Sequence, residues 1–393
     1  MKQDEQVRLL KHLIHQIDTG TNLDAGTMRK APASAYTCPE RAERERRLFF
    51  RERPQMIGMS GDLPENGSFL TRNDIGMSLL ATRDSSGRFR AFVNACRHRG
   101  VAVEGEERGK RTRFMCPFHA WTYSSEGELV NVPKPEHFGD VDRSCHGLVE
   151  LPAVERYGVL LVHPDPQGEI DAEKTLEGLG PDFDSWGFAD YAYVGCDTYD
   201  MPLNWKLAID TFGETYHFGA LHKSTLYPVF HGNVQGWDHW DLNHRMVLCT
   251  RQIDVMRHKP ESEWNIREGA FPVYWMFPNV MFNIGERMVI IVRVLPHETE
   301  VGRSVSQISF YVNPAVLEIA PKEALHAQAT QTFTSVIRDE DYAAASLSQR
   351  SAESGLIDYF VFGRNEPTLH HYHDTYNKVL GLPPLEELPA VRG

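Results

Sequence analysis

Two short Cys/His pairs constrain this chain more than any other feature of its sequence. The first pair is Cys96 and His98, spaced C-x-H, and the second is Cys116 and His119, spaced C-x-x-H. Seventeen residues separate the two pairs, and each pair supplies one thiolate and one imidazole. Gly100 and Pro117 favour tight turns in both segments. The pattern predicts two loops that together hold one metal centre.

Two thiolates and two neutral imidazoles suit either zinc or a Rieske [2Fe–2S] cluster. Common zinc fingers pair Cys with Cys and His with His along the chain, whereas each short segment here mixes the two. In the cluster, the cysteines bind one iron and the histidines bind the other. Neutral imidazoles make such a cluster less negative, which raises its potential above that of a four-cysteine cluster. The spacing favours the cluster over zinc.

The segment 54–165 that contains both pairs is predicted to be a small antiparallel β domain. Strand candidates are 77–83, 88–94, 113–116 and 159–163, with hairpin turns at 84–87 and 124–127. Both Cys/His loops follow predicted strands. A metal centre at the tip of a β structure is therefore expected.

The flanking segments are richer in helix signals. Apolar residues at helical spacing predict a helix over 3–18, and the charged segment 38–53 suggests another. Helices are also expected over 204–223 and 321–351 and near the C-terminus. Strands are expected over 271–295, broken at Pro278-Asn279 and Gly285-Glu286, and over 303–313. The prediction is an α+β protein with three parts: a helical segment 1–53, the β domain 54–165 and a second domain 166–393.

A second metal site is indicated between residues 204 and 223. On an α-helix, Asp210, Glu214 and His217 would lie within ~60° of one another. His217 and His222 would lie ~140° apart, so a shared metal requires the helix to end or bulge, which Gly219 would allow. Two histidines and a carboxylate with open positions form the facial triad of non-heme Fe(II) oxygenases.

Composition excludes several classes of protein. The chain has 393 residues, 41% hydrophobic and 24% charged, and a formal net charge of −13. That charge argues against nucleic acid and anionic membranes as partners. No apolar run approaches the ~20 residues of a membrane span, and the start lacks the apolar core of a signal peptide. A cytoplasmic location is expected, so the six cysteines are not expected to form disulfides.

Both motifs resemble those of the Rieske non-heme iron oxygenases, specifically the alpha subunit of aromatic-ring-hydroxylating dioxygenases. The similarity lies in CRHRG at 96–100, CPFHAW at 116–121 and the pattern D/E-x-Y-H-x4-H, matched from Glu214 through His222. It implies an N-terminal Rieske domain and a C-terminal catalytic domain with an antiparallel sheet flanked by helices. It also implies that Trp121 shields the cluster from water.

The resemblance extends to further site residues. His217 and His222 would bind a mononuclear Fe(II), and the third ligand would be an aspartate in an E-D pair that precedes a Q-R pair. Glu340-Asp341 precedes Gln349-Arg350 in this way, so Asp341 is the first choice, with Glu340 and Asp339 as alternatives. Glu214 would link His217 to His119 of a neighbouring subunit. Asp210 stands where many members have asparagine, and its role stays open, catalytic or merely lining the site.

The activity that the resemblance implies is that of a terminal oxygenase. It would use O₂ and electrons from a separate NAD(P)H-dependent reductase, directly or through a ferredoxin, because the chain has no GxGxxG after a strand. The substrate would be aromatic or otherwise hydrophobic, and the reaction mono- or cis-dihydroxylation. The assembly would be a homotrimer or an α3β3 complex, because a neighbour's cluster must come close.

Two alternatives remain open from the sequence. One is a Rieske monooxygenase that demethylates or hydroxylates an alkyl group, including that of an amine. The other is a plain electron carrier, against which the length of the chain argues. The expected substrate pocket is apolar, with lining candidates Phe212, Phe218, Leu221, Trp237, Trp240, Trp275, Phe277 and Phe282.

Overall fold

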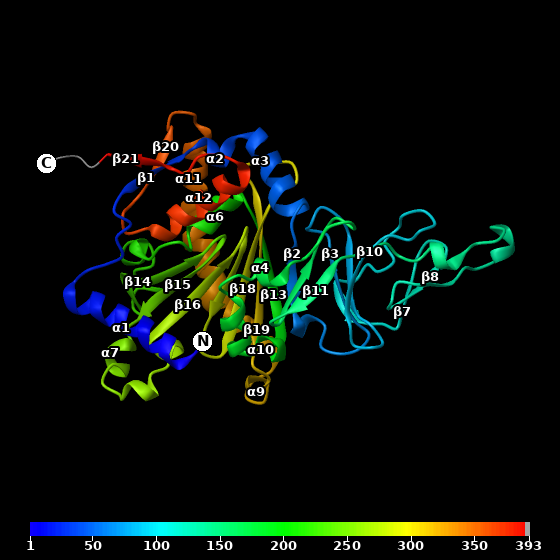
Figure 1. Ribbon diagram of the computed structural model, residues 1–393, viewed down its shortest axis with the longest axis horizontal. Helices are drawn as coiled ribbons and strands as arrows, with labels where there is room; N and C mark the ends of the chain where they lie inside the picture. The colour runs from blue at the N-terminus through cyan, green and yellow to red at the C-terminus, as the bar shows by residue number, and fades with distance from the viewer. Residues whose placement is uncertain (390–393) are drawn as a thin grey trace. The chain divides into compact units, whose positions relative to one another are not determined.

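The computed structural model describes residues 1–389, which form two compact units (Figure 1). The smaller unit comprises Arg46–Thr175 and Gly187–Ala192. The larger unit comprises Met1–Glu45, Leu176–Trp186 and the chain from Tyr193 onward. No helix among residues 1–389 is both long and apolar enough to cross a membrane.

The smaller unit is built from three antiparallel sheets. Their strand orders are β10-β5-β4-β3-β6, β11-β12-β2 and β7-β8-β9. The strands are β2 (Gln55–Met59), β3 (Ser68–Arg72), β4 (Leu79–Arg83), β5 (Phe89–Val93), β6 (Arg108–Lys110), β7 (Arg113–Met115), β8 (Thr122–Ser124), β9 (Leu129–Asn131), β10 (Glu150–Leu151), β11 (Ala153–Arg156) and β12 (Val159–Val162). Its short helical turns are η1 (Arg46–Arg51), η2 (Ser60–Asp62), η3 (Pro135–His137), η4 (Arg143–Cys145), α4 (Ala172–Thr175) and η5 (Phe188–Asp190).

The hairpin between β4 and β5 forms where turn residues were predicted. Asp84 accepts hydrogen bonds from the backbone N–H groups of Ser86 and Arg88, and Gly87 adopts a φ of +84° that glycine tolerates. The second predicted turn, at 124–127, joins the paired strands β8 and β9, and β7 leads directly into Cys116. Both Cys/His loops follow strands, as predicted.

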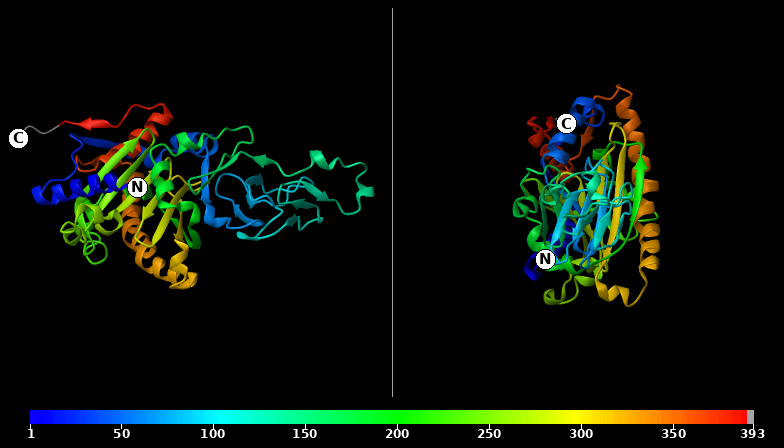
Figure 2. Two further views of the ribbon diagram at one scale, coloured as in Figure 1. Left: turned by 60° about the horizontal axis from the view of Figure 1, so that its bottom comes forward. Right: turned by 90° about the vertical axis from the view of Figure 1, so that its right-hand side faces the viewer.

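The larger unit contains a seven-stranded sheet in the order β13-β19-β18-β17-β16-β15-β14. Its strands are β13 (Ala192–Met201), β14 (Phe230–Trp240), β15 (Asn243–Thr250), β16 (Ala270–Met276), β17 (Val280–Ile284), β18 (Met288–Pro296) and β19 (Ser304–Val312). A second, three-stranded sheet joins distant segments in the order β20-β1-β21, with β1 at Met28–Pro32, β20 at Tyr359–Phe362 and β21 at Glu386–Leu388. Figure 2 shows the helical stretch from α10 to α11 running along the large sheet.

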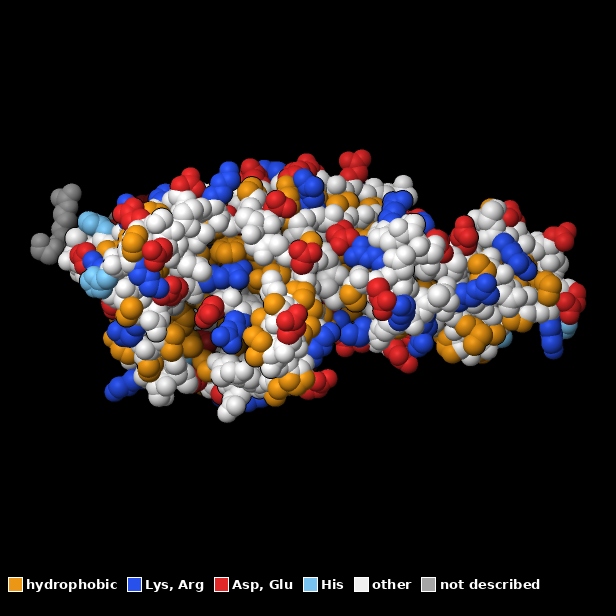
Figure 3. All heavy atoms as spheres, turned by 90° about the horizontal axis from the view of Figure 1, so that it is seen from below, with side chains coloured by type: hydrophobic (Ala, Val, Ile, Leu, Met, Phe, Trp, Pro, Cys, Tyr) orange, Lys and Arg blue, Asp and Glu red, His pale blue; other side chains and the backbone are white. Residues whose placement is uncertain are grey.

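Helices complete the larger unit. They are α1 (Gln3–Thr19), α2 (Ser34–Thr37), α3 (Pro39–Glu45), α5 (Gly180–Trp186), α6 (Trp205–Asp210), η6 (Tyr216–Gly219), α7 (Ile253–Met256), η7 (Glu261–Glu263), α8 (Ile266–Gly269), α9 (Pro314–Leu317), α10 (Lys322–Ala329), η8 (Thr330–Thr334), η9 (Ile337–Asp341), α11 (Tyr342–Glu353) and α12 (Pro367–Leu380). Here η8 and η9 are π-helical turns. Figure 3 shows acidic and basic side chains interspersed on the surface, as expected for faces in contact with water.

Most predicted elements are confirmed. The N-terminal helix forms as α1 and buries Leu9, Leu10 and Leu13 in a hydrophobic cluster. The segment 271–295 breaks between β16, β17 and β18 at the predicted Pro-Asn and Gly-Glu positions. The strands β14 and β15 were not predicted.

The predicted helix over 204–223 is wrong beyond its first turns. Asn204 caps α6 by accepting a hydrogen bond from the backbone N–H of Lys206, but the helix ends at Asp210. Gly213 explains part of this ending, because a Cβ there would lie 2.4 Å from a methyl group of Leu369 in α12. Tertiary packing therefore requires a glycine where the helical pattern would continue.

Candidate metal centres

The two Cys/His loops share one backbone geometry. The N–H of Gly100 donates to the carbonyl oxygen of Cys96 at 2.8 Å, and the N–H of Ala120 donates to that of Cys116 at 3.0 Å. In each loop the cysteine N–H also donates to the carbonyl oxygen five residues further on, at 2.8 Å. Gly100 and Ala120 both adopt the left-handed conformation, with φ of +76° and +57°. The loops are thus two copies of one turn.

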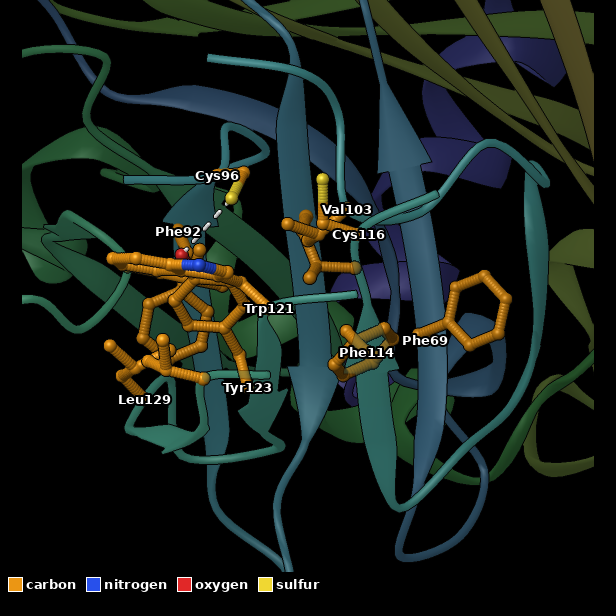
Figure 4. Close-up of a cluster of buried hydrophobic side chains, with 12 residues drawn as sticks. Phe69, Phe92, Cys96, Val103, Phe114, Cys116, Trp121, Tyr123 and Leu129 are labelled. Atoms are coloured by element: carbon orange, nitrogen blue, oxygen red, sulfur yellow. Dashed lines mark hydrogen bonds between the residues drawn. The ribbon is translucent and has the colours of Figure 1, made fainter. Parts of the chain in front are cut away.

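The four side chains of these loops differ in exposure. Cys96 and Cys116 are 4% and 2% exposed, within the hydrophobic cluster drawn in Figure 4. The rings of His98 and His119 lie 4.5 Å apart, with His119 exposed. Trp121 is buried and stacks on His98 with ring centroids 5.3 Å apart. The thiols are therefore buried in the core, His98 is half-buried against Trp121, and His119 lies in water.

Two further observations fit a bound cluster. The Nδ1 atom of His98 is buried and has no hydrogen-bond partner among the described residues. The hydroxyl of Tyr123 lies 3.3 Å from the sulfur of Cys96 (Figure 4). It also accepts a hydrogen bond from the N–H of Arg97. Hydrogen bonds to cluster sulfur are one means by which proteins raise the potential of such centres. Sequence reasoning missed Tyr123, because no spacing rule links it to the motif.

A second cluster of ligand-type side chains forms in the larger unit. His217, His222 and Asp341 each offer one atom, and these atoms lie within 4.8 Å of one another. The Nε2 atoms of His222 and His217 lie 3.0 and 3.4 Å from Oδ1 of Asp341. The Nε2 of His217 is buried without a hydrogen-bond partner among the described residues. Two imidazoles and one carboxylate on one side of a point fit a facial triad.

The opposite nitrogen of each histidine contacts its own carboxylate. The Nδ1 of His217 contacts Glu214, and the Nδ1 of His222 lies 2.6 Å from Oε2 of Glu340. A proton on Nδ1 leaves the lone pair of Nε2 free for a metal, and such carboxylates fix the tautomer and the ring orientation. Both rings are thereby held ready to bind a cation.

The electrostatics of this cluster also favour a cation. Burial lowers the pKa of His217, but the carboxylates of Asp341 and Glu214 outweigh burial and raise that pKa to about 9. Burial acts against the charge on His222 too, and Asp341 with Glu340 raises its pKa above the ordinary value. Three carboxylates around two imidazoles leave excess negative charge, which a divalent metal would balance.

Irregular backbone positions this cluster. His217 lies in the single 3₁₀ turn η6, and the chain then turns again before His222. Asp341 ends the π-helical turn η9, in which the extra residue rotates the following side chains relative to an α-helix. Such π turns are frequent at functional sites. The helix periodicity used on the sequence therefore could not describe this geometry.

The structure distinguishes among the three acidic candidates of the late helix. Asp341 is 7% exposed and faces both histidines, whereas Glu340 contacts the outer nitrogen of His222. Asp339 lies at the surface and pairs with Arg338 at 2.6 Å. The geometry thus places one carboxylate at the centre, one behind it and one in solvent.

Asp210 lies in a different network. It accepts a hydrogen bond from the hydroxyl of Tyr36 at 2.7 Å and contacts Nε2 of His373 at 3.0 Å. Asp210 is not among the residues that line the cavity beside the triad. Tyr36 and His373 were not singled out on the sequence, because they lie far from Asp210 along the chain.

A cavity of about 200 Å³ opens directly on the triad. One wall is the sheet, through β14 to β17, and the facing wall comes from η8 and η9. Its apolar lining consists of Phe212, Phe218, Leu226, Phe230, Met246, Leu248, Phe271, Val273, Phe333, Val336 and Ile337. Phe212 and Phe218 were predicted to line it, and the other six predicted candidates lie outside this lining.

Comparison with known proteins agrees with both centres. The family model of the Rieske [2Fe-2S] domain matches residues 53–153. The family model of the ring hydroxylating alpha subunit (catalytic domain) matches residues 188–382. The chain belongs to the Rieske non-heme iron oxygenases. A Rieske oxygenase of this type contains a [2Fe–2S] cluster and a mononuclear iron, and the two side-chain sets described above fit these groups.

Similar Rieske oxygenases include the carnitine monooxygenase oxygenase subunit of Acinetobacter baumannii. It is 24% identical over 82% of this chain and 85% of its own length. Among solved structures, a quaternary ammonium Rieske monooxygenase bound to L-carnitine gives a TM-score of 0.75 at 19% identity, covering 91% of this chain and 96% of its own. Naphthalene 1,2-dioxygenase with bound indole gives a TM-score of 0.70 at 18% identity, and the match covers 91% of this chain and 93% of its own. These structural likenesses establish the shared fold.

Proposed function

We propose that this Rieske oxygenase hydroxylates a hydrophobic substrate that binds in the cavity beside His217, His222 and Asp341. The observation that carries the proposal is that three converging ligand atoms face an apolar cavity. A plain electron carrier has no use for such a cavity. Aromatic compounds are the substrate class that we propose first, because five phenylalanines line the cavity.

The proposed ligand assignment follows the geometry. Cys96 and Cys116 would hold one iron of the cluster, and His98 and His119 the other. His217, His222 and Asp341 would hold the mononuclear iron. When bound, the cluster supplies single electrons and the mononuclear iron supplies O₂ activation.

The chain's own residues perform the remaining tasks. The apolar walls bind the substrate and keep bulk water from the triad. Glu340 accepts from Nδ1 of His222, which keeps the opposite nitrogen directed at the metal position. Glu214 does the same for His217 and also lines the cavity.

Glu214 has a second proposed task between subunits. We assign it to link His217 to His119 of a neighbouring subunit, so that protonation and electron transfer are coupled at the contact. Its contact with Nδ1 of His217 and the exposure of His119 support this assignment. A homotrimer or an α3β3 complex would supply such a contact through a closed head-to-tail ring.

The same proposal includes an external source of electrons. A NAD(P)H-dependent reductase, directly or through a ferredoxin, would reduce the cluster in the cytoplasm. The proposed division of the chain is a helical segment 1–53, a Rieske domain 54–165 and a catalytic domain 166–393. Breakdown of aromatic compounds is the process in which we place it.

A second candidate function is monooxygenation of an amine, by demethylation or hydroxylation of an alkyl group. The similarity to the carnitine monooxygenase subunit favours this candidate. Both candidates use the same metals and differ in substrate and in the number of oxygen atoms transferred.

Oxygen labelling tests the proposal. Holoenzyme with a generic reductase is screened against aromatic and amine substrates under ¹⁸O₂, with product mass as the measurement. A product with one or two ¹⁸O atoms is expected, and Asp341→Ala should abolish it, whereas the surface variant Asp339→Asn should not. Oxygen uptake without a labelled product in any screen would contradict the proposal.

A further inference from the structure

The polar part of the cavity lining is small and uncharged apart from the triad and Glu214. Among the residues that the structure describes, no lysine or arginine lines the cavity. The carboxylates of Asp341 and Glu214 are already held by imidazoles. An anionic group would therefore enter without a counter-charge, and a cationic group would meet only carboxylates that the imidazoles and a bound metal already engage.

The two lining threonines have little left to offer as donors. The hydroxyl of Thr211 donates to the carbonyl oxygen of Ala208 at 2.9 Å, and that of Thr332 donates to the carbonyl oxygen of Gln328 at 2.9 Å. Both hydroxyls thus serve their own helical turns. They contribute little to the recognition of a substrate.

Unlike the two threonines, Asn283 has a polar side-chain atom that its own backbone does not engage. It lies on β17 in the centre of the sheet, is 2% exposed, and lines the cavity opposite Val273 of β16. Its Nδ2 donates to the carbonyl oxygen of Ile290 at 3.2 Å. Because that carbonyl can only accept, this bond fixes the orientation of the amide. The Oδ1 of Asn283 has no hydrogen-bond partner among the described residues.

An amide oxygen that borders an apolar cavity without a protein partner marks a position where a ligand group can donate a hydrogen bond. Its neighbours on the same sheet face are apolar: Met246, Leu248, Phe271 and Val273. A substrate group that donates a hydrogen bond would satisfy Oδ1 while the rest of the substrate contacts these side chains.

The small size of the cavity also disfavours a charged substrate. A cavity of about 200 Å³ is only somewhat larger than apolar cavities that enclose benzene, about 150 Å³. The cavity is partly open, but a compact substrate bound beside the triad would still contact mainly apolar side chains, so a charged end there would lose much of its hydration. Phenylalanine rings attract cations, but weakly compared with the loss of hydration next to a bound metal cation.

We infer that Asn283 is a specificity-determining residue that selects a compact, uncharged substrate with a hydrogen-bond donor. This inference rests on the proposed function, because it assumes that the cavity beside the triad is the substrate site. It separates this chain from relatives named for the zwitterion carnitine, despite the similarity in sequence.

Two matched ligand pairs test the inference by calorimetric binding to iron-loaded, anaerobic oxygenase. Benzyl alcohol and toluene differ by one hydroxyl, and benzyl alcohol should bind about fivefold tighter. Choline and its uncharged isostere 3,3-dimethylbutan-1-ol differ by one charge, and the isostere should bind at least about tenfold tighter. In Asn283→Leu, the preference for benzyl alcohol should vanish while toluene binds as well as before.

Thr332→Val is the control variant and should keep both preferences, because its hydroxyl serves the helix. If Asn283→Leu does not fold, Asn283→Val, which suits a strand, gives the same comparison. Tighter binding of choline than of its isostere, or an unchanged benzyl alcohol preference in the Asn283 variant, would overturn the inference. Iron and sulfide assays on the same sample separate this failure from failure of the proposed function. That function requires both the cluster and the mononuclear iron, whereas the inference about Asn283 can fail with both present.

Discussion

The two candidate metal centres are built on opposite principles. The Cys/His loops come from one short stretch of chain, 96–119, and repeat a single turn closed by backbone hydrogen bonds. The triad joins residues that lie far apart, since Asp341 follows His222 by 119 positions along the chain. In the first centre His119 is exposed and His98 half-buried, whereas in the second His222 and Asp341 are buried and His217 is half-buried beside a cavity.

This difference agrees with what each centre would do. A cluster that exchanges electrons with partners benefits from exposed histidines, whereas a centre that activates O₂ needs a dry cavity. The first centre depends on local backbone geometry. The second depends on carboxylates that orient the histidines, and therefore on the packing of the whole unit.

The largest expected effect is selective loss of one metal. Cys116→Ser should lose the cluster and keep the mononuclear iron, whereas His222→Ala should keep the cluster and lose the mononuclear iron, because the two ligand sets share no residue. Iron content and the visible absorption of the cluster measure this, and both variants should be inactive. Loss of both metals in both variants would show that the centres are not independent.

The next effect concerns the link between the centres. With excess Fe(II), Glu214→Gln should retain both metal centres, because glutamine can still accept from Nδ1 of His217, although more weakly than the carboxylate. Turnover should fall on the order of 100-fold, because the variant lacks the carboxylate that is proposed to couple the centres. Product formation per iron is the measurement, with Asp339→Asn as the control. Full activity of the Glu214 variant would refute the assigned role.

A smaller effect should follow from the carboxylate behind His222. Glu340→Gln weakens the bond to Nδ1 and should lower the affinity for Fe(II) about tenfold without changing the cluster. Competition with a chelator measures this affinity. An equal loss of cluster iron would mean that the variant disturbs the fold rather than the site.

The smallest expected effect concerns the shared turn of the two Cys/His loops. Gly100→Ala should cost about 1 kcal/mol of stability, because its φ of +76° is unfavourable for alanine while the space around it is open. Ala120→Gly should be neutral or slightly stabilising, because relief of the left-handed alanine is offset by backbone entropy. Chemical denaturation monitored by cluster absorption compares the two. Equal effects would contradict the shared geometry.

The sequence could predict the first centre because its determinants are local. C-x-H and C-x-x-H specify both the ligand types and the loops, and no distant segment must be located. The same holds for α1, whose apolar spacing is regular, and for the breaks between β16, β17 and β18 at Pro-Asn and Gly-Glu. In each case the signal lies within a few residues.

The sequence predicted the contact of Glu214 with His217 by resemblance, but not the contact of Glu340 with His222 or the backbone that positions these residues. Helix periodicity fails at His217 because α6 ends early, where Gly213 must pack against α12. The pairing of Glu340 with His222 requires a π turn that has no clear sequence signal. Asn283 looked like an ordinary strand residue, and only the cavity distinguishes it.

Total iron and acid-labile sulfide in anaerobically purified protein test the central claim most directly. The account predicts about three irons and two sulfides per chain, two irons in the cluster and one at the triad. Zinc in place of iron, or iron without labile sulfide, would contradict it.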